Sequence, residues 1–168
     1  MVRLRPFKRQ DIRVMLPWVA DERVFAMWCS GAFAYPLTKE QMEAHMARLE
    51  ACAEEWMMTA LDEQGRMIGC FSVKKADYER NCAHLGMIVV DDTRRGQGLG
   101  CQMVEKAVEY GFAVLGVDRV TLGVFTCNPR AHACYCKAGL ADDYLEKGAY
   151  IFHEEVWDRQ HMETRRQS

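Results

Sequence analysis

The stretch RRGQGLG, Arg94–Gly100, places three glycines at alternate positions directly after two arginines. Glycine leaves out the side chain where a backbone must come close to a ligand. Apolar residues recur at helical spacing from Leu99 to Val114, so a helix is predicted from the glycine loop to about Leu115. The N-terminal end of a helix offers unpaired N–H groups and a partial positive charge. Loop and helix together predict a cradle for an anion such as a phosphate.

The glycine spacing argues against the common nucleotide motifs. It is Gly-x-Gly-x-Gly rather than the Gly-x-Gly-x-x-Gly of dinucleotide sites, and no acidic residue ends the strand that follows. The chain also lacks the Gly-Lys-Ser/Thr of nucleoside triphosphate loops. A mononucleotide-binding module is therefore a weak rival. A flexible turn with solvated arginines would show the same pattern. The neighbouring elements must therefore distinguish such a turn from an anion-binding loop.

Two strands flank the predicted helix. Residues 83–90, AHLGMIVV, have the apolar character of a buried strand, and residues 119–125, RVTLGVF, alternate in polarity. A strand, a helix and a second strand within about forty residues are typical of a right-handed crossover between parallel strands. A second helix is predicted after them, with Asn128 as N-cap, Pro129 at its first position and Gly139 as its stop.

Similar signals predict the rest of the chain. Thr38 and Gln41 have the spacing of a capping box, which indicates a helix over residues 39–55. The other expected elements are a strand at 2–7, a helix that Asp11 caps and Pro17 ends or bends, a short turn from Asp21, hairpin strands at 56–61 and 66–75, and an alternating strand pattern over 149–159. Residues 160–168 are expected to be frayed.

The composition indicates one domain over residues 1–168. The chain is 49% hydrophobic, which suffices for one core but would be small for two domains. Its 22 Lys and Arg against 24 Asp and Glu lack the basic excess of nonspecific nucleic-acid binders. Residues 1–20 lack the apolar block of a signal peptide, and no run reaches membrane-spanning length. We therefore expect neither nucleic acid nor membrane among its partners.

The eight cysteines indicate neither a disulfide framework nor a metal site. No Cys-x-x-Cys pair is present, and Cys134 and Cys136 lack a partner set with metal-ligand spacing. Reduced thiols are usual in the cytoplasm. A cytoplasmic location and no bound metal are expected.

Two motifs resemble those of one family, the GNAT superfamily of N-acetyltransferases. The segment VDDTRRGQGLG is similar to its acyl-CoA signature, [Arg/Gln]-x-x-Gly-x-[Gly/Ala], at Arg95, Gly98 and Gly100. The segment NPRAHACYCKAGL resembles its second signature, Asn-x-x-Ala-x-x-x-Tyr-x-Lys-x-Gly-Phe, with Leu140 in place of the phenylalanine. The matching residues of the second signature are Asn128, Ala131, Tyr135, Lys137 and Gly139. Two signatures at the family's usual separation are much more specific than either alone.

The resemblance covers residues 83–140, the expected acyl-CoA-binding core, and extends to the whole chain by the order of its elements. The opening RLRPFKRQDI is most similar to the branch that includes ribosomal-protein Nα-acetyltransferases. The implied fold is an α/β (α+β) domain with a mixed, mostly antiparallel, six- to seven-stranded sheet and helices on both faces. Its central parallel strands, near 83–90 and 119–126, are expected to splay apart and admit acetyl-CoA.

The resemblance implies transfer of an acetyl group from acetyl-CoA to a primary amine, by direct attack in a ternary complex without an acyl-enzyme. The amine would belong either to a protein or peptide N-terminus or to a small molecule. The sequence leaves open the identity of this acceptor, a longer acyl donor and a homodimer. A noncatalytic acyl-CoA-binding sensor or regulatory domain on the same fold is the alternative, because a fold does not fix a function.

Acetyl-CoA is expected to bind along this core. The resemblance places its pyrophosphate on the amides of the glycine loop and its pantetheine amides on the edge of strand 83–90. The expected cofactor-binding residues are Ile88, Val90, Arg95, Gly96, Gly98, Gly100, Cys101, Asn128 and Ala131. Asn128 and Tyr135 are about two helical turns apart, so they share a helix face and can contact one extended ligand. Arg94 and Arg130 are either further phosphate contacts or solvated.

Two side chains are expected to take part in catalysis. Tyr135 matches the family's tyrosine that protonates or hydrogen-bonds the departing CoA thiolate. His84 falls where some family members place a glutamate base, and histidine titrates near neutral pH. A hydrogen-bonded structural histidine, with a water chain as the base, is the alternative. The resemblance further implies that a backbone amide near Met87 or Ile88 polarises the thioester carbonyl.

The acceptor amine is expected between two segments that build this site in the family. Trp28, Phe33 and Tyr35, together with Phe25, stand on one side. Carboxylates near the end of the chain are available on the other, namely Asp142, Asp143, Glu146, Glu154 and Glu155. They would suit a cationic amine, although exposed carboxylates are usually only solvated.

Overall fold

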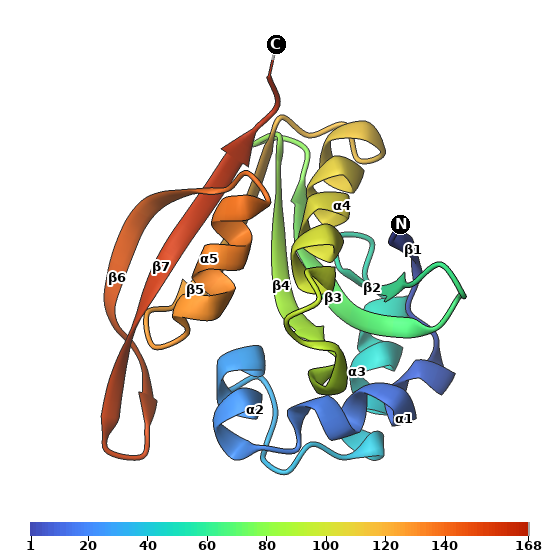
Figure 1. Ribbon diagram of the computed structural model, residues 1–168, viewed down its shortest axis with the longest axis vertical. Helices are drawn as coiled ribbons and strands as arrows, with labels where there is room; N and C mark the ends of the chain where they lie inside the picture. The colour runs from blue at the N-terminus through green and yellow to red at the C-terminus, as the bar shows by residue number, and fades with distance from the viewer. Residues whose placement is uncertain (168) are drawn as a thin grey trace.

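Seven strands form one sheet, in the order β1-β2-β3-β4-β5-β7-β6, within residues 1–167, which the computed structural model describes (Figure 1). The strands are β1 Arg3–Pro6, β2 Trp56–Leu61, β3 Met67–Asp77, β4 Cys82–Val90, β5 Arg119–Phe125, β6 Ala141–Phe152 and β7 Glu155–Arg165. Neighbouring strands are antiparallel except for β4 and β5, which are parallel. The predicted mixed, mostly antiparallel sheet is confirmed.

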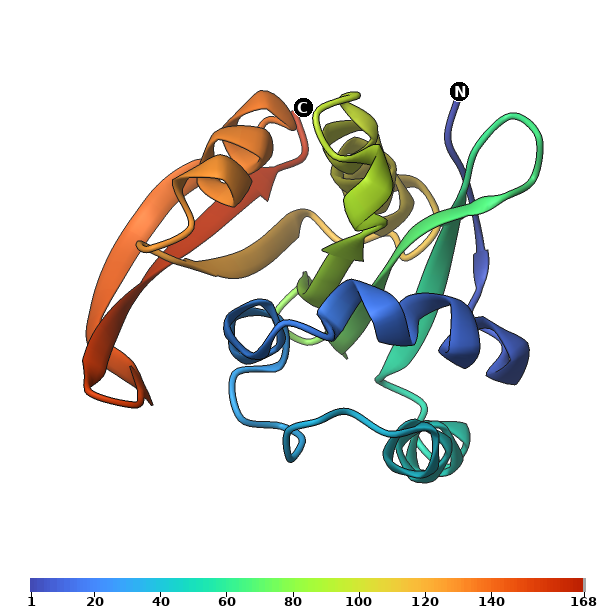
Figure 2. The same cartoon turned by 60° about the horizontal axis from the view of Figure 1, so that its bottom comes forward.

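Helices cover both faces of this sheet, as predicted. α4 and α5 lie on one face, and α1, α2 and α3 lie on the other (Figure 2). The helices are α1 Ile12–Met15, α2 Glu22–Cys29, α3 Lys39–Glu50, α4 Leu99–Ala113 and α5 Pro129–Lys137. Within residues 1–167, no helix is both long enough and apolar enough to cross a membrane.

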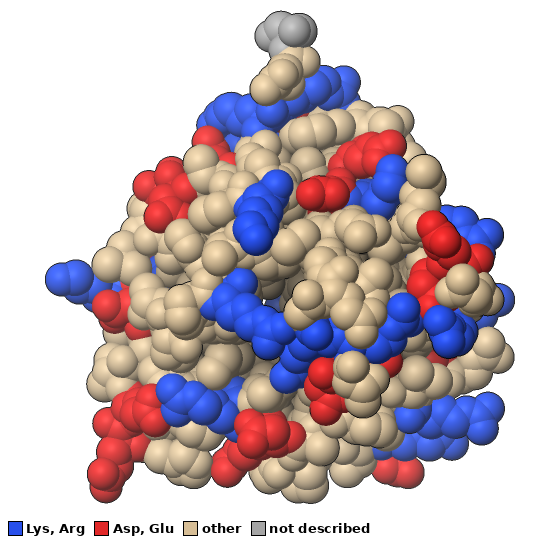
Figure 3. Space-filling view, viewed as in Figure 1, with Lys and Arg blue, Asp and Glu red and all other residues tan. Residues whose placement is uncertain are grey.

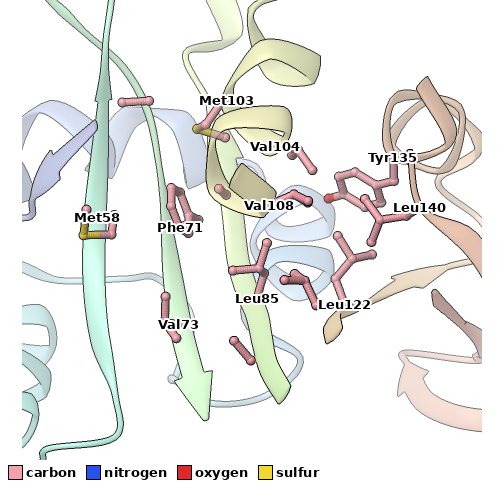
Figure 4. Close-up of a cluster of buried hydrophobic side chains, with 14 of the residues drawn as sticks. Met58, Phe71, Val73, Leu85, Met103, Val104, Val108, Leu122, Tyr135 and Leu140 are labelled. Carbon is pink, nitrogen blue, oxygen red and sulfur yellow. The ribbon is translucent and has the colours of Figure 1, made fainter. Parts of the chain in front are cut away.

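Alternation along the strands divides the apolar side chains between two cores. Met57 packs into the core beneath α1, α2 and α3, whereas its neighbour Met58 packs into the core beneath α4 and α5. In the latter core, Tyr135 of α5 points toward Val104 and Val108 of α4 (Figure 4). β2 and β3 are therefore buried on both faces, and the two faces of the sheet present different residues to a ligand.

β4 and β5 are paired only at their beginnings. Residues 82–84 pair with residues 119–121, and the ladder ends at the pair of His84 and Thr121. Both strands continue beyond this pair, β4 to Val90 and β5 to Phe125. The expected separation of the two central parallel strands is thus confirmed.

α2 joins the separated strands from one face of the sheet. The indole nitrogen of Trp28 donates a hydrogen bond of 2.8 Å to the backbone oxygen of Met87 on β4. Ala26, two residues earlier, packs with Phe125 of β5 and Trp157 of β7. The helix is anchored to both sides of the gap, so it fixes how far apart the strands stand.

The end of the chain differs from the prediction. Residues 160–165 belong to β7 and are not frayed, while Ser168 lies outside the described residues. β7 lies between β5 and β6, and Met162 is 1% exposed in the core beneath α4 and α5. A single buried methionine among polar residues is a weak sequence signal, which explains the wrong prediction. The predicted helix over 39–55 is also too long, because α3 ends at Glu50.

A buried carboxylate joins the first helical turns to the sheet. Asp11 is 3% exposed and accepts hydrogen bonds from Arg5 at 2.6 and 2.8 Å, from the Lys8 amide at 2.9 Å and from the Thr59 hydroxyl at 2.9 Å. Burial by itself would raise the pKa of Asp11, but the hydrogen bonds outweigh it and hold this pKa below its ordinary value. The folded state therefore favours the ionised carboxylate.

Asp11→Asn is expected to lower the free energy of unfolding by about 3 kcal/mol at pH 7, because it leaves Arg5 without its partner. Since the folded-state pKa of Asp11 lies below the unfolded one, the carboxylate stabilises the fold above about pH 4 and loses this effect at lower pH. Urea denaturation at pH 7 and in steps below pH 4 measures the difference. Glu79→Gln, at an exposed position, is the control and should change stability by less than about 0.5 kcal/mol. A difference that stays constant as the pH falls would contradict this account.

Candidate active site

A cavity of about 710 Å³ occupies the gap between β4 and β5. The loop before α4 and α5 line it from one face of the sheet, and α2, β3 and β7 line it from the other. A band of Lys and Arg side chains crosses the surface over α5 and the loop before α4 (Figure 3). The basic residues that line this part of the cavity are Arg94, Arg95, Arg130 and Lys137. A cavity of this size suits a ligand larger than a simple metabolite.

Every predicted cofactor-binding residue lines this cavity. They come from three separate parts of the fold, namely β4, the loop with the first turn of α4, and the first turn of α5. The residues are Ile88, Val90, Arg95, Gly96, Gly98, Gly100, Cys101, Asn128 and Ala131. The fold thus brings the two sequence motifs together around one space.

A side chain is disfavoured at each of the three loop glycines, but for different structural reasons. Gly96 and Gly98 have φ angles of 84° and 75°, a region that side chains disfavour. A Cβ on Gly100 would instead stand 3.3 Å from Cγ2 of Val90. Gly98 is also the N-cap of α4 and offers no side chain to bind the first amides of the helix. Those amides are left for a ligand anion, at the positive end of the helix.

The arginine pair of the loop is divided between two roles. Arg94 donates a hydrogen bond of 2.7 Å to Asp62, a buried residue of the turn between β2 and β3. Burial alone would raise the pKa of Asp62, but hydrogen bonds from Arg66 and Arg94 hold it well below its usual range. Arg95 is exposed at the edge of the cavity. Sequence reasoning missed Asp62, since nothing local links the hairpin turn to the glycine loop.

α5 begins as the sequence predicts. The side chain of Asn128 accepts a hydrogen bond of 3.2 Å from the Ala131 amide, and Pro129 occupies the first helical position. Tyr135 lies farther along the same helix, is 7% exposed and lines the cavity. Burial raises the pKa of Tyr135 above its ordinary value, so the phenol keeps its proton at neutral pH.

A β-bulge interrupts β4 beside the cavity. Cys70 and Ser72 of β3 pair with Val89 and Gly86 of β4, so β4 carries an extra residue between them. Met87 lies in this bulge with a φ of 47°, and Trp28 binds its carbonyl. A bulge leaves the amide of the extra residue outside the ladder. The backbone near Met87 and Ile88 can therefore offer a donor to the cavity, and no sequence signal marks the bulge except the glycine before it.

His84 lines the cavity at the last pair of the β4–β5 ladder. Its Nδ1 lies 2.8 Å from the hydroxyl oxygen of Thr121 on β5. Burial lowers the pKa of His84 to about 4, and the electrostatic effects of Lys74, His161 and Arg159 act in the same direction. The imidazole is therefore neutral at pH 7 and presents a free electron pair on one ring nitrogen.

The predicted acceptor residues are only partly assembled at the cavity. Trp28 lines it, whereas Phe33 and Tyr35 do not. Phe33 stacks on Trp28 with ring centroids 5.6 Å apart, and the Tyr35 hydroxyl donates to the Ala20 backbone oxygen at 2.9 Å. Both side chains thus support the segment around α2 from outside the cavity.

The carboxylates near the end of the chain also lie outside the cavity lining. Glu155 binds Arg23 at 2.7 and 3.0 Å, Asp142 lies 2.7 Å from His132, and Glu146 lies 2.8 Å from His161. In their place the cavity receives Lys74, Arg159 and His161, which sequence reasoning did not single out. These three side chains point into the same cavity because of the strand register across β3, β4, β5 and β7. Within residues 1–167, no group of His, Cys, Asp and Glu side chains gathers to hold a metal ion.

Comparisons with known proteins agree with this geometry. The family profile described as Acetyltransferase (GNAT) family matches residues 21–140. Glucosamine 6-phosphate N-acetyltransferase 1 of Oryza sativa subsp. japonica is 27% identical over 122 residues, which are 69% of this chain and 72% of that protein. Spermidine N(1)-acetyltransferase of Vibrio cholerae is 22% identical over 140 residues, covering 83% of this chain and 79% of that protein.

A solved structure shows the same fold over nearly the whole chain. The crystal structure of spermidine N-acetyltransferase from Vibrio cholerae, in complex with CoA and spermine, gives a TM-score of 0.86 at 18% identity. The likeness covers 98% of this chain and 95% of that one. The family profile in turn spans both sequence motifs and the elements that bring them together. The chain therefore belongs to the acetyltransferase (GNAT) family and is an N-acetyltransferase whose cosubstrate is acetyl-CoA.

Proposed function

We propose that this protein transfers the acetyl group of acetyl-CoA directly to the primary amine of a small molecule, in a ternary complex. The observation that carries the proposal is the cavity between β4 and β5, which holds the glycine loop, Tyr135 and His84 in one space. Holding both reactants in one cavity removes much of the entropic barrier of a two-substrate reaction. No enzyme nucleophile is needed, because the amine itself attacks the thioester.

The two substrates would approach from opposite faces of the sheet. Leu85 and Leu122 point into the core beneath α4 and α5, where the glycine loop lies. By alternation, their neighbours His84 and Thr121 point to the face that α2 covers. Acetyl-CoA therefore enters beside α4 and α5, and the acceptor amine enters beside α2.

Different residues of the chain would bind the pyrophosphate, the pantetheine arm and the thioester of acetyl-CoA. The amides at the start of α4, with Arg95 and Arg130 nearby, would hold the pyrophosphate. The exposed edge of β4 around Ile88 and Val90 would pair with the pantetheine amides. A backbone amide of the bulge at Met87 would then donate to the thioester oxygen as negative charge develops on it.

The reaction forms a bond from nitrogen to the acetyl carbon and breaks the bond from that carbon to sulfur. The departing thiolate takes the phenolic proton of Tyr135, which burial keeps in place at neutral pH. The nitrogen loses one proton, and His84 is assigned as the acceptor, with a chain of water molecules as the other route. A neutral His84 can accept this proton, although a pKa of about 4 makes it a weak base until a ligand changes its surroundings.

The activity is tested by mass spectrometry after the protein and acetyl-CoA are incubated with a panel of amines. The panel contains amino sugars and their phosphates, polyamines, amino acids and peptides with free N-termini, the last because of the resemblance to the ribosomal-protein branch. A product heavier by one acetyl group supports the proposal. If calorimetry shows acetyl-CoA binding and no amine in the panel is modified, a noncatalytic sensor becomes the better description.

Tyr135→Phe is expected to lower kcat about a hundredfold to ten-thousandfold, because the thiolate would leave without a proton donor. The dissociation constant for acetyl-CoA should stay nearly unchanged, since the ring and its packing remain. Initial-rate kinetics and isothermal calorimetry measure the two effects separately. Tyr78→Phe removes a hydroxyl from a tyrosine that is 65% exposed, and it should leave both quantities unchanged. Full activity in Tyr135→Phe would remove Tyr135 from the mechanism.

The imidazole of His84 is expected to stay neutral from pH 8 down to about pH 5 and to take up a proton only near pH 4. Because burial and positive neighbours both disfavour the charged ring, the titration lies well below that of an ordinary histidine. NMR of the imidazole protons follows this titration, and the spectrum of His84→Gln assigns the signal. A midpoint at pH 6 or above in the free protein would show that the ring is not held neutral in this way.

A further inference from the structure

The charged side chains that line the cavity are positive. Its lining in residues 1–167 contains six Lys and Arg residues and no Asp or Glu, and the six are Lys74, Arg94, Arg95, Arg130, Lys137 and Arg159. Four of them belong to the loop before α4 and to α5, where the phosphates of acetyl-CoA would lie. The remaining two, Lys74 and Arg159, come from β3 and β7 and lie on the acceptor side.

A β-bulge on β3 directs Lys74 into the cavity. Val73 pairs with Leu85 and Lys75 pairs with His84, so Lys74 is the extra residue between two consecutive pairs. A bulge re-aims the side chain that it carries. The Lys74 methylenes then cross Gly86 of β4, where a Cβ would stand only 2.8 Å from Cε of Lys74. Any side chain at position 86 would displace the lysine.

Arg159 is placed in the same manner on the other side of the gap. Its methylenes cross Gly123 of β5, where a Cβ would stand 2.8 Å from Cδ of Arg159. Its guanidinium carbon lies 4.9 Å from the ring centroid of Phe125, which fixes the direction of the charge. Two glycines on the two separated strands thus make room for two long cationic side chains.

These charges are incompletely matched by the protein. Lys74 is half-buried and forms no hydrogen bond or ion pair with any residue from 1 to 167. Burial lowers its pKa, and this effect outweighs the opposite effect of the Glu55 charge. Among residues 1–167, the Arg159 guanidinium pairs only with the carboxylate of Glu146, at 3.4 Å, and that carboxylate also binds His161 at 2.8 Å. A half-buried cation without a partner is unfavourable, and a ligand carboxylate or phosphate would remove this cost.

We propose that the acceptor amine carries an anionic group, a carboxylate or a phosphate, which binds Lys74 and Arg159. The proposal rests on the proposed acetyl transfer and names the class of its substrate. A polyamine would place its positive charges among cations. Of the carboxylates near the end of the chain, Glu155 already binds Arg23, and Glu146 already binds His161 and Arg159.

The test compares matched acceptors in the presence of acetyl-CoA. Glucosamine 6-phosphate is paired with glucosamine for the phosphate, α-amino acids are paired with their amides for the carboxylate, and spermidine represents cationic amines. We expect at least one anionic member to exceed its neutral partner about tenfold or more in kcat/KM, mainly through a lower KM. The pair that shows the effect distinguishes phosphate from carboxylate.

Lys74→Met keeps the methylenes over Gly86 and removes only the charge. It should reduce the preference about tenfold by raising KM, with kcat less affected. Lys74→Glu should reverse the preference toward spermidine. Lys75→Met is the matched control, because Lys75 is the exposed neighbour on the same strand and does not line the cavity. Thermal melting confirms that each variant is folded.

Two failures can be told apart. If acetylation occurs but neutral or cationic amines are preferred, or if Lys74→Met leaves the preference intact, the anionic acceptor is wrong and the acetyl transfer stands. If no amine is acetylated, calorimetry of the same anionic amines with the CoA-bound protein decides. Binding that Lys74→Met abolishes supports the anion site and overturns the acetyl transfer, whereas absence of binding overturns both.

Discussion

The end of the β4–β5 ladder at His84 and Thr121 is the constraint on which the site depends. Parallel strands that continue side by side would normally pair along their whole length, because unpaired backbone groups in a protein interior are costly. Here the two strands part, and their free edges face a cavity that a ligand can fill. α2 keeps this opening in place, since Trp28 holds β4 and Ala26 packs against Phe125 of β5. The helix is thus part of the site although it carries no part of either motif.

Glycines shape the site in two different ways. In the loop before α4, Gly96 and Gly98 supply backbone angles that leave the first amides of the helix free for an anion. On the strands, Gly86 and Gly123 supply space, because the side chains of Lys74 and Arg159 cross them. The loop glycines can be recognised from the local sequence, whereas the role of the strand glycines depends on which strand lies alongside. Both bring positive charge to the cavity, one from backbone dipoles and the other from side chains.

This difference explains what the sequence could predict. The glycine loop, the Asn128 cap and the crossover between parallel strands are local signals, and the structure has all three. The separation of β4 from β5 was expected only through the family resemblance. Lys74 and Arg159 gave no signal, and the bulge at Met87 is marked only by the glycine before it, because their positions follow from register across strands far apart in the sequence. The pairing of Asp142, Glu155 and Glu146 with His132, Arg23 and His161 could not be predicted for the same reason, because these partners come together only in the fold.

The charge around His84 connects the two proposals. Burial disfavours the imidazolium most, and Lys74, His161 and Arg159 add to the effect, so the free site holds a weak base. An anionic acceptor that binds Lys74 and Arg159 would offset two of these charges and raise the pKa of His84 toward the range in which histidine transfers protons well. The base would then gain strength only when the correct substrate is present. A cationic amine would act in the opposite sense, so the arrangement that selects the acceptor would also decide whether its proton can be removed.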